Sequence, residues 1–102
     1  MYARIGRFDV VEGKESELTA AYKKALAPFT VQKGFREGTL YIEPGTGSAL
    51  SITLWETKED ADATAKGDFI ETAIALVAPY QKQRPSFTGY VMRARETRPP
   101  KM

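Results

Sequence analysis

Hydrophobic and polar residues alternate along four segments of the chain, which predicts four β-strands, because successive side chains of a strand point to opposite faces. The predicted strands span residues 2–11, 35–43, 50–55 and 86–94. Between the second and third lies Pro44-Gly45-Thr46-Gly47, a sequence typical of a tight turn. These two strands are therefore predicted to form a hairpin.

Two further regions carry hydrophobic residues at steps of three and four, the spacing of one face of an α-helix. In the first region, Pro28 lacks a backbone donor and should bend or end the helix, and Gly34 should stop it. Gly67 divides the second region into two segments. The positions that form the two stripes are Leu18, Tyr22, Ala25, Leu26 and Phe29, and then Phe69, Ala73, Leu76, Val77 and Tyr80.

Three polar residues stand where helix caps are expected. Ser16 or the residues just before it are the candidates for the first helix, Thr57 for the first segment after the third strand, and Asp68 for the segment after Gly67. Thr57 is also followed by acidic residues, which favour the positive end of the helix dipole. The acidic clusters of the chain are therefore interpreted as solvated helix starts and turns and not as metal sites.

The order strand, helix, strand, strand, helix, strand predicts an α+β fold of the ferredoxin-like βαββαβ type. Its sheet is antiparallel and four-stranded, with both helical regions on one side. The chain has 102 residues, which suffices for one core. We predict one domain over residues 1–95 and a basic, Pro-containing C-terminal tail over residues 96–102.

The third predicted strand, residues 50–55, is hydrophobic on both faces. Leu50, Ile52 and Leu54 line one face, and Trp55 ends the other face beside Ser51 and Thr53. Leaving the three aliphatic side chains in water would forgo roughly 1.5–3 kcal/mol each. The helices can cover only one face, so a second copy of the chain is predicted to cover the other and form a homodimer.

The composition argues against several classes of partner. The 15 Lys plus Arg and 13 Asp plus Glu give a net charge of only +2, too weak to indicate a nucleic-acid or membrane partner. The chain has no Cys, which is compatible with a reducing cytoplasm, and nothing in it resembles a signal peptide or a membrane span. We therefore expect a cytoplasmic protein.

The residue types that most often carry catalysis or bind metals are missing. Without His, Asn or Cys, the chain lacks the commonest base at neutral pH, the commonest metal ligand and every Ser-His or Cys-His arrangement. What remains is a space between sheet and helices that aromatic side chains should line, which suits a flat aromatic ligand. The candidates are Trp55, with Arg4, Ser51, Thr53, Tyr22, Phe69 and Tyr80 as binding residues. The alternative is that the aromatic residues only form the core and that Arg4 packs its alkyl stem on a neighbour.

Several segments together resemble the antibiotic biosynthesis monooxygenase (ABM) family over nearly the whole chain. They are Tyr2-Ala3-Arg4-Ile5, Glu12-Gly13-Lys14, Lys33-Gly34-Phe35 and the run from Ser51 through Trp55 to Ala61. The resemblance implies a dimeric α+β barrel, in which two ferredoxin-like subunits bring their sheets face to face. Members include quinone-forming oxygenases that act on polyketide phenols without a metal or organic cofactor, and haem-degrading oxygenases.

The positions that distinguish these members exclude haem degradation. Haem-degrading relatives carry Asn, Trp and His where this chain has Gly6, Thr64 and Ile74. The polyketide oxygenases share the Trp at position 55 but carry an Asn where this chain has Ser51, and their further Tyr and Arg match no residue here.

The resemblance implies a cofactor-independent monooxygenase that acts on a small aromatic or phenolic metabolite. In this interpretation Trp55 is the catalytic residue that orients the ring, Ser51 or Thr53 bonds to an oxygen, and Arg4 favours the phenolate. Tyr22, Tyr80 or the acidity of the substrate itself would manage protons. The alternatives are a binding or accessory dimer without catalysis, and a scaffold whose cleft is filled by side chains. The sequence does not identify the substrate.

Overall fold

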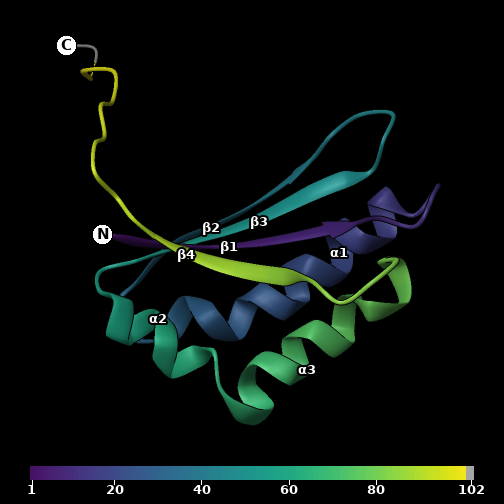
Figure 1. The fold of residues 1–102 in the computed structure, drawn as a ribbon, viewed down its shortest axis with the longest axis horizontal. Helices are drawn as coiled ribbons and strands as arrows, with labels where there is room; N and C mark the ends of the chain where they lie inside the picture. Colours follow the sequence, from purple (N-terminus) through teal and green to yellow (C-terminus); the bar gives the residue numbers. More distant parts are fainter. Residues whose placement is uncertain (101–102) are drawn as a thin grey trace.

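The strands form one antiparallel sheet, and the helices lie together on one side of it (Figure 1). The computed structural model describes residues 1–100. In chain order the elements are β1 (Tyr2–Asp9), α1 (Glu15–Leu26), the short 3-10 helix η1 (Ala27–Val31), β2 (Phe35–Ile42), β3 (Ser48–Trp55), α2 (Lys58–Thr64), α3 (Gly67–Val77), the 3-10 helix η2 (Ala78–Tyr80) and β4 (Ser86–Val91).

The strand order in the sheet is β2-β3-β1-β4, with antiparallel neighbours throughout. This confirms the ferredoxin-like α+β prediction and the hairpin between β2 and β3. The register pairs Arg4 with Thr53 on β3 and with Gly89 on β4. It also pairs Gly6 with Ser51, so the polar residues of β1 and β3 that face the helices lie side by side.

The breaks in the helices lie where proline and glycine predicted them. The α1 helix ends at Leu26, and Pro28 lies in the first turn of η1. The second helical region is divided into α2 and α3, and α3 begins at Gly67, whose φ is +58°. Gly34 has φ +79°, and a Cβ there would clash with the carboxylate of Asp60, so the exit from η1 requires glycine.

One of the three predicted caps is confirmed. The Thr57 side chain accepts a hydrogen bond of 3.1 Å from the backbone N–H of Asp60. Ser16 and Asp68 lie inside their helices, so the predictions for these two residues were wrong, whereas the alternative of a residue just before Ser16 agrees with the position of the cap. Lys14 and Lys66 hold the cap positions and make no capping bond through their side chains.

Three strands end earlier than predicted, β2 by one residue and β1 and β4 by two or more. The β1 strand ends at Asp9, after which Val10 forms an isolated bridge with Gln81. The β4 strand ends at Val91, where the predicted strand reached residue 94. Residues 92–100 form no helix or strand and extend away from the sheet (Figure 1), and the rest of the predicted tail lies outside the described residues.

The core between sheet and helices consists of two clusters. The first contains Phe8, Val10, Leu18 and Ala49, near the end of β1. The second is built on Phe29, Trp55 and Ala61, with Phe35 and Phe69 packed against it. Its rings meet edge to face, at centroid distances of 6.5 Å for Phe29 and Trp55 and 5.3 Å for Phe35 and Trp55.

The opposite face of the sheet, which we call the outer face, is covered by none of the helices described (Figure 1). The register places Ile5 of β1 beside Ile52 of β3, and Tyr41 of β2 beside Leu50. The aliphatic side chains are half-buried by one another, while Tyr41 and Tyr90 are 58% and 44% exposed. The prediction that β3 is hydrophobic on both faces is confirmed. None of the helices described is long and apolar enough to cross a membrane.

Candidate functional site

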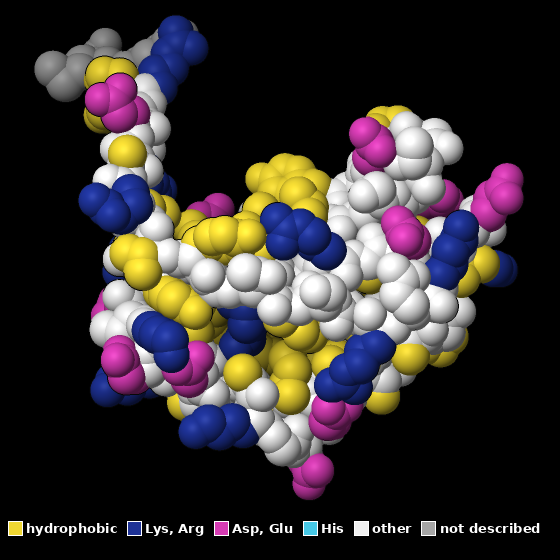
Figure 2. Space-filling view, in the orientation of Figure 1, with side chains coloured by type: hydrophobic (Ala, Val, Ile, Leu, Met, Phe, Trp, Pro, Cys, Tyr) yellow, Lys and Arg dark blue, Asp and Glu magenta, His cyan; other side chains and the backbone are white. Residues whose placement is uncertain are grey.

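A cavity lies between the sheet and the two long helices, and the space-filling view shows a hollow beneath β4 with mostly hydrophobic walls (Figure 2). The apolar part of the lining comes from both core clusters and from α3 and β4. The polar part consists of Arg4 on β1, Ser51 and Thr53 on β3, and Tyr22 on α1. A few polar groups in an apolar wall are the usual composition of a small-molecule site.

The cavity is small for a ligand site. Its volume is about 70 Å³, whereas ligand pockets commonly measure about 300–1,000 Å³. One wall is formed by Phe87, which is 41% exposed and lies over Gly6, where a Cβ would come within 2.8 Å of the ring. A ligand larger than one ring would therefore have to displace Phe87 or extend through the mouth.

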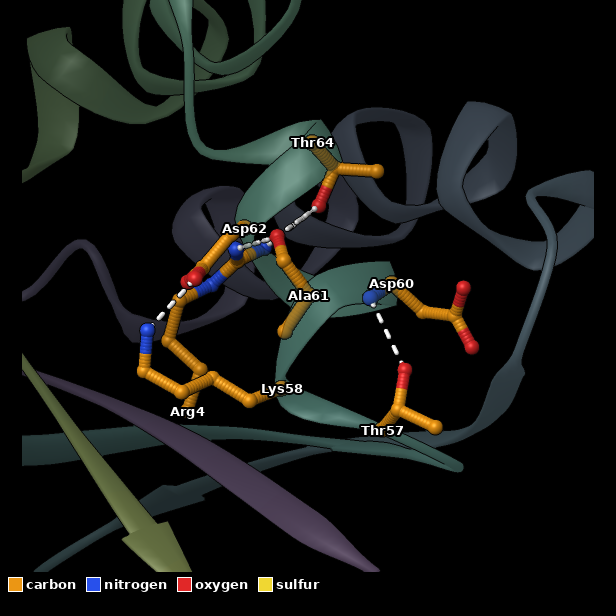
Figure 3. Close-up of polar contacts among 7 residues, drawn as sticks. All are labelled: Arg4, Thr57, Lys58, Asp60, Ala61, Asp62 and Thr64. Carbon is orange, nitrogen blue, oxygen red and sulfur yellow. Dashed lines mark hydrogen bonds and ion pairs between the residues drawn. The ribbon is translucent and has the colours of Figure 1, made fainter.

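Arg4 reaches from the sheet to α2 (Figure 3). Its Nη1 donates to the backbone carbonyl of Ala61 at 2.7 Å, and its Nη2 donates to the hydroxyl of Thr64 at 3.1 Å. Both acceptors are neutral, and a guanidinium carries five N–H donors. Arg4 is therefore fixed in direction and keeps donors for a further partner.

Aromatic faces lie beside the charge of Arg4, and none of the ion pairs among residues 1–100 includes it. Its guanidinium carbon lies 5.5 Å from the Trp55 ring centroid and 5.9 Å from that of Phe29. Arg4 forms no ion pair within residues 1–100, and Asp62 is paired with Lys58 at 2.7 Å (Figure 3). Burial lowers the pKa of Arg4, and the negative charge of Asp62 raises it in part. An anion in the cavity would restore the solvation that Arg4 has lost.

Tyr22 and Ser51 form the second polar group of the lining. The Tyr22 hydroxyl donates to the backbone carbonyl of Thr39 at 3.1 Å, and its oxygen lies 2.9 Å from Oγ of Ser51. Burial raises the pKa of Tyr22 above its ordinary value of 10.0, although the hydrogen bond with Ser51 lowers it in part. Tyr22 is therefore a protonated phenol at neutral pH.

Trp55 lies behind the cavity wall and does not line it. Its exposure is 0%, and its Nε1 donates to Oγ1 of Thr53 at 3.0 Å. The Thr53 hydroxyl in turn donates to the backbone oxygen of Arg4 at 3.5 Å. The N–H of Trp55 and the hydroxyl of Thr53 are therefore both hydrogen-bonded within the protein.

Four of the seven predicted site residues line the cavity, namely Arg4, Ser51, Thr53 and Tyr22. Trp55 is buried behind it. Phe69 packs on Phe29 at a ring-centroid distance of 4.7 Å and faces a separate groove between α1 and α3. Tyr80 packs against the first core cluster.

The sequence reasoning missed Phe87 and the contribution of α3 to the lining. Phe87 could have been found from the alternation within β4, which places it on the same face as Gly89. Its position over Gly6 depends on the register of β4 with β1, and alternation alone does not set that register. Within residues 1–100, no three His, Cys, Asp or Glu side chains are grouped so that they could hold a metal ion.

A family model described as "Antibiotic biosynthesis monooxygenase" matches residues 1–76. No curated protein matches the chain. Among solved structures, SnoaB from Streptomyces nogalater, described as a cofactor-independent oxygenase, superposes with a TM-score of 0.75 at 20% sequence identity, covering 97% of both chains.

Two other solved structures show the same fold. Rv0793 from Mycobacterium tuberculosis has a TM-score of 0.71 at 18% identity and covers 94% of this chain and 98% of its own. A conserved protein from Methanosarcina mazei has a TM-score of 0.72 at 13% identity, with 87% of this chain and 89% of its own covered.

Proposed function

Because the chain belongs to the antibiotic biosynthesis monooxygenase family, we propose that it is a monooxygenase that oxidises a small phenolic metabolite to a quinone in the cavity beside Arg4. The observation that carries the proposal is a guanidinium on the wall of an apolar cavity, with no ion-pair partner among residues 1–100. Such a group stabilises a phenolate, the form of a phenol that gives up an electron most readily. SnoaB, a relative in fold, is described as working without a cofactor, and we propose the same for this chain.

In the proposed reaction the bound phenolate transfers one electron to dioxygen, giving a substrate radical and superoxide. These recombine with formation of a carbon–oxygen bond, and protonation gives a hydroperoxide. The O–O bond then breaks as the same carbon loses its hydrogen, and the products are a quinone carbonyl and one water. Each turnover thus consumes one dioxygen and one substrate.

The protein would contribute position and charge to these steps. Arg4 would hold the phenolate oxygen, and Trp55 would act as a positioning residue through Thr53 and through its contact with Arg4. Tyr22 does not serve as the base, because burial raises its pKa. The acidity of the substrate, increased beside Arg4, would release the first proton to water.

Oxygen uptake with a panel of phenols that runs from single-ring compounds to anthrone-like ones tests the proposal. The native protein should consume one dioxygen per substrate, and Arg4→Met should lower kcat/KM about 100-fold, as expected when a donor to a developing anion is removed. Lys33→Met, at a side chain that is 93% exposed, is the matched control and should leave the rate unchanged. Trp55→Phe should reduce kcat; equal rates would exclude Trp55 from the mechanism.

A second candidate is a binding module that holds an aromatic metabolite without changing it, and the lack of His and Cys side chains, which most often carry catalysis, favours it. Binding of the panel without oxygen uptake under air would establish this function and exclude the first.

We also propose that two copies of the chain pair through their outer faces. The support is the uncovered aliphatic surface around Ile5, Leu50, Ile52 and Leu54 and the exposed rings of Tyr41 and Tyr90 beside it. Figure 2 shows hydrophobic side chains gathered on that side of the sheet. Sedimentation velocity at micromolar concentration measures the association directly, and a folded lone subunit would contradict it.

A further inference from the structure

The hydrogen bonds around Tyr22 define which polar group the cavity offers at its Ser51 end. A tyrosine hydroxyl has one hydrogen, and that of Tyr22 is given to the carbonyl of Thr39, which can only accept. The 2.9 Å bond between Tyr22 and Ser51 must then use the hydrogen of Ser51. Ser51 is left with lone pairs and no hydrogen to give, so it faces the cavity as an acceptor only.

Thr53 adds no competing donor on the same strand. Its oxygen accepts from Nε1 of Trp55, and its hydrogen is directed to the backbone oxygen of Arg4. The polar lining therefore has two ends of different character. Arg4 supplies a positive charge with free donors, and Ser51, two residues from Thr53 on the sheet, supplies an acceptor.

We propose that the cavity selects an aromatic ligand with two polar ends, an anionic oxygen that binds Arg4 and a hydroxyl that donates to Ser51. The inference rests on the proposed function only in taking this cavity as the ligand site. It narrows the ligand from any small phenol to a ring that carries a hydroxyl apart from its anionic group. The volume of about 70 Å³ favours a single ring.

Binding of matched single-ring probes, followed by NMR titration under nitrogen, tests the inference. The first pair is 4-hydroxybenzoate and 4-methoxybenzoate, in which the para oxygen carries either the hydrogen that would bond to Ser51 or a methyl group. The native protein should bind the hydroxy compound about five- to tenfold more tightly, because the methoxy compound leaves two acceptors facing each other. Benzoate should lie between the two, and phenol should bind more weakly than 4-hydroxybenzoate because it lacks the anion.

A second pair separates the two sources of an anionic oxygen. Tetrafluorohydroquinone and its monomethyl ether are acidic phenols and present a phenolate to Arg4 in place of a carboxylate. A preference for the hydroxy compound in both pairs shows that Ser51 accepts the hydrogen bond whether Arg4 binds a carboxylate or a phenolate. A preference in the second pair alone restricts the anionic group to a phenolate and supports the inference in that form.

Two conservative variants test the direction of the hydrogen bonds. Ser51→Ala should reduce the ratio of the two affinities to about one. Tyr22→Phe keeps Ser51 but frees its hydrogen, so Ser51 can then donate to the methoxy oxygen, and the ratio should also fall toward one. If Tyr22 has only a structural role, its replacement should weaken the binding of both probes equally and leave the ratio of their affinities unchanged. Preserved amide spectra serve as the folding control for both variants.

Equal affinities for hydroxy and methoxy probes in the native protein would overturn the inference, as would an unchanged ratio in Tyr22→Phe or the absence of binding by every probe. These outcomes are independent of turnover. A hydroxyl preference without oxygen uptake in the panel assay leaves this inference standing and removes the oxygenase. Oxygen uptake without a hydroxyl preference removes this inference and leaves the oxygenase standing.

Discussion

The two faces of the sheet differ in how their side chains are satisfied. On the face toward the helices, Arg4, Ser51, Thr53 and Trp55 each have a hydrogen-bond partner within the chain. On the outer face, the aliphatic residues of the same strands, such as Ile52, are half-buried beside their cross-strand neighbours and lie under none of the described helices (Figure 1). The comparison teaches that the two faces of one sheet serve different purposes. The covered face holds oriented polar groups around a cavity, while the uncovered face offers hydrophobic area suited to association.

Removing Trp55 should have the largest effect, because it supports the covered face from behind. Trp55→Ala should lower the free energy of unfolding by about 3–5 kcal/mol, the usual cost of deleting a large buried aromatic side chain. The ring is fully buried, contacts Phe29 and Phe35 and gives Thr53 a donor. Urea unfolding at one fixed protein concentration measures the change. Val31→Ala, at a position 82% exposed, is the control, and a loss of less than about 1 kcal/mol for Trp55→Ala would contradict the role assigned to it.

A charge introduced on the outer face should weaken the proposed association of two copies. Ile52→Lys places an ammonium group at the centre of the proposed interface, once in each copy, and burying it unpaired is costly. The dissociation constant measured by sedimentation should rise at least about 100-fold, or about 2.7 kcal/mol. Val31→Lys introduces the same group at an exposed site away from the sheet and should leave association unchanged. If Ile52→Lys sediments like the native chain, the outer face is not the interface.

The smallest expected effect concerns the dependence of stability on alkaline pH. Burial raises the pKa of Tyr22 in the folded chain above 10.0, so between the unfolded and folded pKa values the folded state holds the additional proton. Stability from this group is therefore complete below about pH 10 and is lost as the pH rises through the folded pKa. Tyr22→Phe should show a shallower decline in urea midpoint above pH 10 than the native chain. Tyr41→Phe controls for the removal of a tyrosine hydroxyl, and identical slopes for native and Tyr22→Phe would refute the expectation.

The fold followed from local features of the sequence. Alternation identified the strands, Pro28 and Gly67 located the helix breaks, and Thr57 marked a helix start, because each acts on its own backbone or its nearest neighbours. The Ser16 and Asp68 predictions failed because a cap depends on the backbone angles at the helix entry, and residue type alone does not set them.

The candidate site was only partly predictable, because alternation gives the face of a side chain but not its depth. Trp55 and Ser51 share a face of β3, yet Trp55 ends the strand beneath Phe29 and Phe35, while Ser51 meets the cavity. Tyr80 was placed on the stripe of α3, but Pro79 changes that turn to a 3-10 helix, and Tyr80 packs on the first core cluster instead. The direction of the bond between Tyr22 and Ser51 depends on a backbone carbonyl of another strand, which no spacing reveals.

The position of Trp55 makes the protein its own optical reporter. It is the only tryptophan, sealed from water, and the guanidinium of Arg4 lies over its ring. Its emission should lie at the short-wavelength end of the tryptophan range. An anion that reaches Arg4 alters the electric field across the indole, so occupancy of the cavity can be followed by intrinsic fluorescence without any label.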